Sequence, residues 1–293
     1  MSGAAGPAGP GGQGPAGAAG GAPVKLGADR LSVVVPVWRA TLDPYEAISL
    51  DRTFQVFAGQ HLAMVKPDGL DTAALEARYP FAAVETFAPD FFRSVQGYNR
   101  LMLSTGFYER FLASQYLLIC QLDVFPFRDD LASWVERGYD YVGAPWLSKT
   151  RLSASLHWAK MHLSKLVLGA QDKVYRYETR NRVGNGGFSL RQVETHHRLT
   201  IAMKDQIEHY LRNQGTHHFH EDIFWSIEPS KKGHPHRTPG VEEALAFSFD
   251  INPDRLYRLA GQRLPMAAHG WYKGRHLAFW APHVTAAGVR LPA

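Results

Sequence analysis

The sequence predicts an α/β fold in which helices cover both faces of a mostly parallel sheet. Short apolar segments rich in β-branched residues alternate with amphipathic segments along the first half of the chain. This alternation is typical of parallel strands joined by helical crossovers. The most apolar segment, 116–127, carries one acidic residue, and open α/β sheets bind ligands beyond the carboxyl ends of their strands. We therefore expect the functional site at that edge of the sheet.

The individual elements follow from periodicity and from helix-breaking residues. Residues 31–38 (LSVVVPVW) predict a buried first strand, and the apolar spacing over 43–57 predicts a helix. Residues 147–170 have a basic amphipathic pattern, which predicts either a helix packed on the body or a contact with a membrane surface or an anionic substrate. The remaining expected elements are strands at 61–66, 82–87, 116–127 and 139–144 and helices at 70–79, 98–113 and 129–137.

Length and composition predict one large domain with two tails. Of the first 23 residues, 20 are Gly, Ala or Pro, and such a segment buries too little apolar surface to offset its ordering entropy. We expect a disordered tail over 1–29, a single domain over 30–282 and a C-terminal tail over 283–293. Apolar runs stay shorter than the roughly 18–20 residues that cross a bilayer, and the start does not resemble a secretory signal, so we expect a cytoplasmic protein.

The charge and cysteine content exclude several classes of protein. The net charge of +5 comes from 32 basic and 27 acidic residues spread along the chain, and recognised nucleic-acid motifs are missing. We therefore expect no nucleic-acid partner. The single cysteine, Cys120, excludes a disulfide framework and a cysteine-based zinc site.

Asp123 is the first candidate for chemistry. It lies near the end of the most apolar segment, where a carboxylate is costly to bury without a cation or hydrogen bonds around it. A divalent metal bound to a diphosphate is one such cation. A structural carboxylate satisfied by its neighbours is the alternative.

A glycine-rich turn at Asn185, Gly186 and Gly187 is the second candidate. Glycines allow a ligand to approach the backbone closely. The surrounding VGNGGFSLR lacks the third glycine of the dinucleotide fingerprint and the Gly-Lys-Ser/Thr of a P-loop. An ordinary tight turn explains two of the glycines more readily than it explains Asn185, Gly186 and Gly187 together.

Acidic and histidine residues supply the remaining candidates. Glu221 and Asp222 start the segment HEDIFW, where they act either as helix-capping acids or as a general base. His269, beside Gly270, is a candidate metal ligand as a neutral imidazole. Five other histidines match no metal-binding spacing, and we expect them to face solvent in loops: His217, His218, His220, His234 and His236.

Taken together and in this order, the motifs resemble the GT-A class of nucleotide-sugar glycosyltransferases, and more closely a bacterial family of formerly unassigned function within it. The resemblance covers about residues 30–280 and implies a single GT-A-like (Rossmann-like) domain. The motifs that carry it are Gln121-Leu122-Asp123, Gly143-Ala144-Pro145-Trp146, Asn185-Gly186-Gly187-Phe188-Ser189-Leu190-Arg191, Glu221-Asp222 and His269-Gly270-Trp271.

The resemblance also implies a divalent cofactor, Mn²⁺ or Mg²⁺. Gln121-Leu122-Asp123 matches an Asp-x-Asp motif that normally holds the metal and the sugar nucleotide. Here Gln121 stands in the first acidic position, so it can bind the donor but adds no charge. Asp123 and His269 are the implied metal ligands. Lys149, Arg151 and Arg191 either assist at the diphosphate or face solvent.

For the remaining site residues, the resemblance implies roles in binding and catalysis. Asp222 is the expected base, with Glu221 orienting the acceptor or the helix, although the order could be reversed. Val35 and Pro36 are expected beneath the nucleotide base. The sugar and acceptor pocket is expected to include Asn185, Gly186, Gly187 and Trp271.

We therefore expect a metal-assisted glycosyltransferase that moves a sugar from a nucleotide-sugar donor to a hydroxyl acceptor. The expected acceptor is a glycan or glycolipid in polysaccharide or glycolipid synthesis, with peripheral contact at the inner face of the membrane as an additional expectation. A candidate base favours inversion over retention. The alternatives are a sugar-nucleotide-binding protein without turnover, suggested by Gln121 in an acidic position, and a basic nucleic-acid-binding protein.

Overall fold

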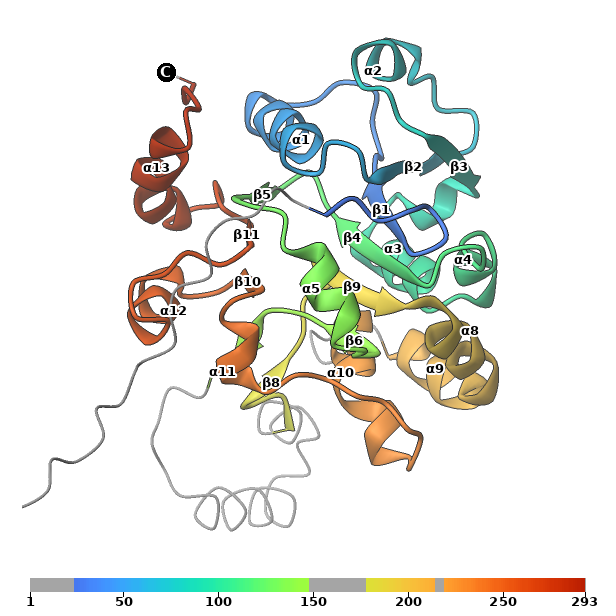
Figure 1. The fold of residues 1–293 in the computed structure, drawn as a ribbon. Helices are drawn as coiled ribbons and strands as arrows, with labels where there is room; N and C mark the ends of the chain where they lie inside the picture. Colours follow the sequence, from blue (N-terminus) through green and yellow to red (C-terminus); the bar gives the residue numbers. More distant parts are fainter. Residues whose placement is uncertain (1–23, 148–177, 214–218, 293) are drawn as a thin grey trace, which may run out of the picture.

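A mixed, mostly parallel sheet forms the centre of the protein. The computed structural model describes residues 24–147, 178–213 and 219–292, and within these the main sheet has six strands in the order β3-β2-β1-β4-β9-β6 (Figure 1). The first four strands in this order are parallel, and β9 is antiparallel to both of its neighbours. The predicted α/β class is confirmed. The strands are β1 (Leu31–Pro36), β2 (His61–Pro67), β3 (Ala83–Phe87), β4 (Tyr116–Cys120), β6 (Tyr141–Val142) and β9 (Phe188–Gln192).

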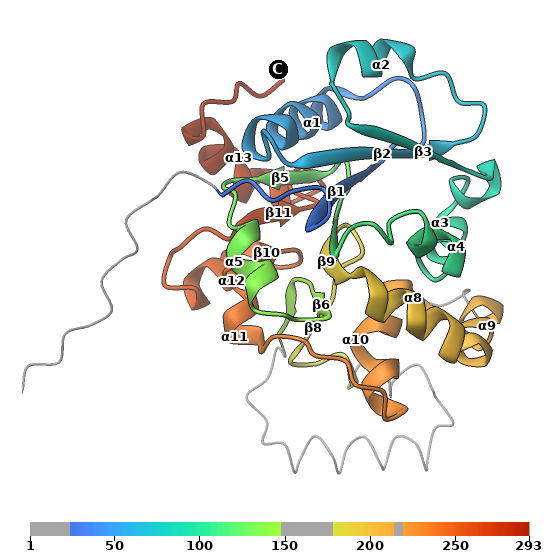
Figure 2. The same cartoon turned by 45° about the vertical axis from the view of Figure 1, so that its right-hand side comes forward.

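Helices pack on both faces of this sheet because its central strands are apolar on both sides. On β1, Val33 and Val35 face one layer of helices while Val34 faces the other. Figure 2 shows α1 and α2 above β2 and β3, with α3, α4, α8 and α9 below these two strands. The first layer holds α1 (Pro44–Val56), α2 (Ala73–Arg78) and α5 (Leu131–Glu136); the second holds α3 (Val95–Met102), α4 (Thr105–Glu109), α8 (Val193–Ala202), α9 (Lys204–Arg212) and α10 (Glu221–Lys231).

A smaller sheet has three strands in the order β10-β11-β5, and two of them, β10 and β11, come from the C-terminal part of the chain. Its core includes Phe125, Trp271 and Trp280 and packs against the last two helices. The remaining elements are η1 (Pro89–Phe91), β5 (Val124–Pro126), β7 (Pro145–Trp146), β8 (Arg182–Val183), α11 (Val241–Ala244), β10 (Ser248–Phe249), α12 (Pro253–Leu259), β11 (Ala267–His269) and α13 (His276–Ala286).

The single strand expected over 116–127 is wrong. It divides into β4, in the main sheet, and β5, which pairs antiparallel with β11 in the small sheet. The Val124 N–H donates to the Gln121 carbonyl at 3.0 Å, which closes a turn between the two strands. Asp123 therefore lies in a turn at the edge of the main sheet.

The helix expected over 98–113 is also divided, into α3 and α4. Ser94 caps α3, and the Ser104 hydroxyl accepts a hydrogen bond from the Phe107 N–H and caps α4. Serine side chains compete for backbone hydrogen bonds at helix starts, so Ser104 begins a new helix where the apolar pattern alone suggested continuity.

The ends of the domain differ from the expected boundaries. The Leu26 N–H donates to Gln60 Oε1 at 3.0 Å, so contact with the body begins before residue 30. The boundary expected after residue 282 falls within α13, where Val284 is fully buried. The basic helix expected over 147–170, including Lys149 and Arg151, lies outside the described residues apart from Leu147. Across the described chain, every helix is too short or too polar to cross a membrane.

Candidate active site

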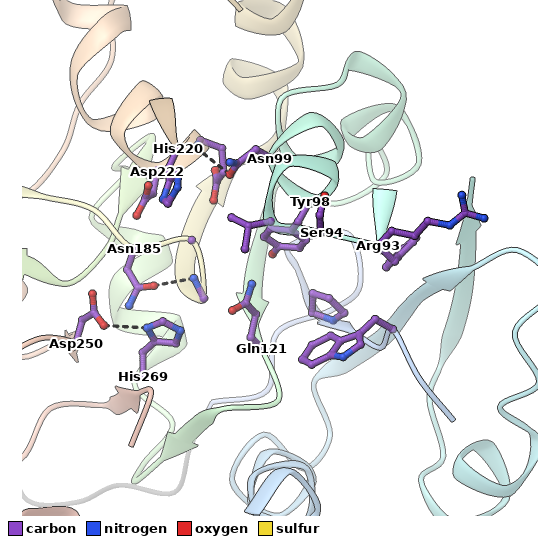
Figure 3. Close-up of a pocket in the computed structure, with 17 residues that line it drawn as sticks. Arg93, Ser94, Tyr98, Asn99, Gln121, Asn185, His220, Asp222, Asp250 and His269 are labelled. Atoms are coloured by element: carbon purple, nitrogen blue, oxygen red, sulfur yellow. Dashed lines mark hydrogen bonds and ion pairs between the residues drawn. The ribbon is translucent and has the colours of Figure 1, made fainter. Parts of the chain in front are cut away.

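A cavity of about 550 Å³ lies at the edge of the main sheet where β1 and β4 end (Figure 3). One wall comes from Pro36 at the end of β1, from Trp38 after it and from the segment 92–99, which enters α3. The other wall comes from the turn before β9, the start of α10 and the residues around β11. This is the edge at which the sequence predicts a ligand site.

Eight of the predicted site residues meet in this cavity: Pro36, Gln121, Asn185, Gly186, Gly187, Glu221, Asp222 and His269. The other three do not line it. Val35 is buried within the sheet, and Asp123 is only 5% exposed. Trp271 is a correction, because it is fully buried, donates its indole N–H to Ser49 Oγ at 2.8 Å and packs edge-to-face on Tyr45.

The two adjacent glycines of the turn each make room for a functional side chain. A Cβ on Gly186 would collide with Glu221 Oε1, and a Cβ on Gly187 would collide with His269 Nε2. Asn185 Oδ1 accepts the Gly187 N–H at 2.7 Å and holds the turn. The Gln121 N–H donates to the Gly187 carbonyl at 2.9 Å, which continues the pairing of β4 with β9 into the site. Close packing of functional groups therefore explains the glycine pair better than an ordinary turn does.

Glu221 is held by a buried arginine. Arg191, in the middle of β9, is fully buried, and its Nη2 lies 3.0 Å from Glu221 Oε1. The same guanidinium donates to the Tyr108 hydroxyl and to Ser189 Oγ, each at 3.1 Å. Burial raises the pKa of Glu221, while Arg191 opposes this shift. Arg191 therefore positions Glu221, which corrects the expectation that it contacts the diphosphate or solvent.

Asp222 has a different environment, although it is the next residue. It lines the cavity, its Oδ1 accepts the Ile223 N–H at 2.9 Å, and within the described ranges no cation lies within ion-pair distance of it. Burial, together with the negative charge of Asp250, raises the pKa of Asp222 to about 6. A carboxylate with this pKa suits a general base, because it is ionised near neutral pH and still basic enough to accept a proton.

Four charged side chains, Asp250, His269, Asp123 and Lys273, contact one another in a row, and the first two of them line the cavity. His269 Nδ1 lies 3.0 Å from Asp250 Oδ1, and His269 Nε2 lies 3.3 Å from Asp123 Oδ2. The Lys273 ammonium donates to the same oxygen of Asp123. Burial works against ionisation of Asp123, but His269 and Lys273 outweigh it and hold the pKa of Asp123 well below its usual range. The two carboxylates also raise the pKa of His269 to about 10 despite its burial.

Two of these side chains, Asp123 and His269, are the implied ligands of a divalent ion. Asp123 Oδ2 and His269 Nε2 face each other and could share one ion, while Asp250 on Nδ1 would orient the imidazole, as carboxylates beside metal-binding histidines do. The oxygen of Asp123 that faces His269 already binds Lys273, and Gln121 supplies no charge. Across the part of the chain that the structure describes, no three His, Cys, Asp or Glu side chains cluster as metal ligands.

Residues 81–269 match a family described only as a protein of unknown function (DUF5672). The chain belongs to this family. Among curated proteins, no sequence relative of this DUF5672 chain is found.

Solved structures similar to this DUF5672 chain include two sugar transferases. A crystal structure of the galactosyltransferase LgtC with donor and acceptor sugar analogues has a TM-score of 0.52 and 15% identity, over 89% of this chain and 97% of that chain. Mouse xyloside xylosyltransferase 1 in its apo form has a TM-score of 0.47 and 11% identity, over 85% of this chain and 98% of that chain. The likeness to LgtC establishes the fold, so the resemblance to the GT-A class is confirmed at that level.

Several lining residues of the DUF5672 chain were not predicted. Asp250 follows the short apolar strand β10, the same pattern that singled out Asp123, so its signal was present in the sequence. The wall at Trp38 and 92–99 carries no recognisable motif. Among the histidines, His220 lines the cavity and His236 is buried, which corrects their expected exposure in loops, whereas His217 and His218 lie outside the described residues.

Proposed function

We propose that this protein is a glycosyltransferase that moves a sugar from a nucleotide-sugar donor to a hydroxyl group of a glycan or glycolipid acceptor. The observation that carries the proposal is Asp222, a carboxylate without a cation partner among the described residues, on the wall of a sheet-edge cavity in a GT-A-like fold. The resemblance to the GT-A class supports a place in polysaccharide or glycolipid synthesis.

In the proposed reaction, Asp222 accepts the proton of the acceptor hydroxyl. The acceptor oxygen then forms a bond to the anomeric carbon of the donor sugar. The bond from that carbon to the diphosphate oxygen breaks, and its electron pair leaves with the nucleoside diphosphate. A base that acts directly on the acceptor favours inversion at the anomeric carbon. Retention would instead leave Asp222 in contact with the sugar.

The deep end of the cavity suits a ligand with many hydroxyl groups. Four polar atoms on lining residues are buried and have no hydrogen-bond partner among the described residues: Tyr98 Oη, Asn99 Nδ2, Asn185 Nδ2 and Glu221 Oε2. Each such atom costs roughly 1–3 kcal/mol when it stays unpaired. A sugar offers both donors and acceptors, so it can satisfy the amides, the hydroxyl and the carboxylate together. The open end, with Pro36, Trp38 and Phe92, offers apolar surface to a nucleotide base.

The test begins with a panel of nucleotide sugars and thermal unfolding of the full chain. A donor that binds the native state raises the melting temperature, and that donor is then used to measure hydrolysis and transfer. Asp222→Asn should abolish turnover and leave donor binding. Asp205→Asn, an exposed acid on α9, is the matched control. The anomeric configuration of the product, read by NMR, decides between inversion and retention.

Two results would contradict the proposal. If no nucleotide sugar stabilises the protein, the donor class is wrong. If a donor binds but its turnover does not exceed that of the Asp222→Asn variant, the alternative of a binding protein without turnover is correct. Gln121 in the acidic position of the Asp-x-Asp motif is the observation that favours this alternative.

A further inference from the structure

The segment 141–146 runs beside the turn that carries Asn185. This described segment includes the motif Gly143-Ala144-Pro145-Trp146 and lies outside the cavity lining. Its strand β7 pairs antiparallel with β8, and the Gly184 N–H donates to the Ala144 carbonyl at 2.9 Å. A Cβ on Gly143 would lie 2.8 Å from the Gly184 carbonyl carbon and 2.9 Å from the Asn185 nitrogen, so only glycine allows the two backbones to approach this closely. The motif therefore supports the turn without lining the cavity.

The Tyr141 hydroxyl holds both backbone groups of Asn185. It accepts the Asn185 N–H at 3.0 Å and donates to the Asn185 carbonyl at 3.2 Å. Tyr141 is fully buried, and burial raises the pKa of its hydroxyl well above the usual value, so it keeps the proton that the second bond needs. Its ring lies 5.8 Å from the guanidinium carbon of Arg191 and stacks on His236, with centroids 6.3 Å apart. The ring, and with it the hydroxyl, is therefore fixed before a ligand binds.

The side-chain amide of Asn185 has one atom committed to the turn and one available to a ligand. Its Oδ1 accepts the N–H groups of Gly187 at 2.7 Å and of Phe188 at 3.4 Å, which fixes the direction of the amide. Its Nδ2 is buried and has no hydrogen-bond partner among the described residues, and Asn185 lines the cavity (Figure 3). A ligand oxygen can therefore meet a donor whose position the protein has already set.

We propose that Tyr141 is a positioning residue, whose hydroxyl holds the Asn185 amide where it donates to an oxygen of the donor sugar. The inference rests on the proposed function, which places a sugar at this polar end of the cavity. Tyr141 lies outside the cavity lining, so its effect on binding passes through Asn185. Without the hydroxyl, the backbone N–H and carbonyl of Asn185 lose their partner in a buried site, and the turn is free to move.

Hydrogen exchange of the full-length protein, followed by mass spectrometry, tests whether the hydroxyl holds the turn. Tyr141→Phe keeps the ring, and exchange over residues 184–188 should become about tenfold faster, because the turn opens more easily. Tyr210→Phe is the matched control: Tyr210 is also fully buried, and its hydroxyl donates to Glu228 at 3.0 Å away from the cavity lining. This control should leave exchange over 184–188 unchanged. Wild-type exchange in Tyr141→Phe would overturn the inference.

Calorimetric titration tests whether the turn carries the effect to the ligand. The probes are UDP-glucose, UDP-galactose, ADP-glucose and GDP-mannose, each with and without Mn²⁺, and the nucleoside diphosphate of whichever binds. Tyr141→Phe should weaken nucleotide-sugar binding about tenfold and nucleoside diphosphate binding less than about threefold, since one contact to the sugar is lost. Asn185→Ala removes the amide itself. In the double variant, Tyr141→Phe should add little to the effect of Asn185→Ala, because both act through one side chain.

Melting temperatures measured on the same samples separate positioning from general destabilisation. Tyr141→Phe and Tyr210→Phe should both melt at lower temperature, whereas only Tyr141→Phe should lose affinity for the nucleotide sugar. If Tyr141→Phe does not fold, Gly143→Ala displaces the same turn while keeping the hydroxyl, and it should give the same pattern of exchange and affinity.

Equal weakening of nucleotide sugar and nucleoside diphosphate, or full additivity of Tyr141→Phe and Asn185→Ala, would overturn the inference and leave the glycosyltransferase proposal in place. Absence of binding by all four nucleotide sugars to the wild-type protein, with and without Mn²⁺, would overturn both.

Discussion

Asp123 and Asp222 are two aspartates of one site in opposite electrostatic environments. Asp123 is covered by Lys273 and His269, and its pKa is held well below the usual range. Asp222 has a negative neighbour, Asp250, and its pKa is raised to about 6. The Asp123 carboxylate therefore stays ionised and binds the side chains of Lys273 and His269, whereas the Asp222 carboxylate can exchange a proton. Environments that separate the pKa values of two acids in this way divide structural and acid–base roles between them.

If Asp222 is dispensable for turnover, the division of roles between Asp123 and Asp222 is wrong. Asp222→Asn removes the proton acceptor and should lower kcat/KM by roughly 10²–10⁴-fold, the range that general base catalysis supplies. Steady-state transfer to the acceptor, measured beside Asp205→Asn, checks this. A rate within a few-fold of the wild type would assign the base to another residue.

A third carboxylate, Glu221, extends the comparison because its partner is a buried guanidinium. Arg191→Met leaves Glu221 uncompensated and should cost about 3–5 kcal/mol of unfolding free energy, measured by urea denaturation. The double variant with Glu221→Gln removes both charges and should recover most of this loss. If the double variant is as unstable as Arg191→Met, Arg191 acts through packing and not through its pairing with Glu221.

Gly187→Ala tests how tightly the side chains of His269 and Gln121 pack against the turn before β9. The new Cβ collides with His269 Nε2 and approaches Gln121 Oε1, so we expect a loss of about 1–3 kcal/mol in stability together with reduced turnover. Gly106→Ala, at an open position in α4, is the control and should be neutral or slightly stabilising. Equal melting temperatures for the two variants would contradict the predicted collision.

The smallest effect should be a shift in the pH profile. Because the base form of Asp222 predominates above its pKa, kcat/KM should rise with pH through about 6. Asp250→Asn removes a negative charge that favours the protonated form, so the rising limb should move to lower pH. A limb that stays in place would mean that burial alone sets the pKa of Asp222.

Much of the fold could be predicted from the sequence, because β1, β2 and β3 are bounded by clear helix-forming and chain-breaking segments. The division of 116–127 could not be, since Leu122 and Val124 continue the apolar run across the turn. What separates β5 from β4 is pairing with β11, a strand more than a hundred residues away. Long-range pairing of this kind overrides local pattern.

The site was predictable where residue type and spacing restrict the chemistry, as at Asn185, Gly186 and Gly187. It was not predictable where a residue serves packing. Trp271 lies two residues after His269, yet its ring fills the core, because β11 ends at His269 and Gly270, with a φ of +60°, turns the chain between them. Lys273 was missed because nothing in its local sequence shows that it reaches Asp123, 150 positions earlier.

The ion pair between Arg191 and Glu221 has a mechanical consequence. It joins the start of α10 to the middle of β9, the antiparallel strand of the main sheet, without exposure to water. Turning or sliding α10 would separate two buried charges, so this wall moves with the sheet as one rigid body. Closure of the cavity around a donor is therefore expected to come from the opposite side, where Trp38 and residues 93–96 are exposed.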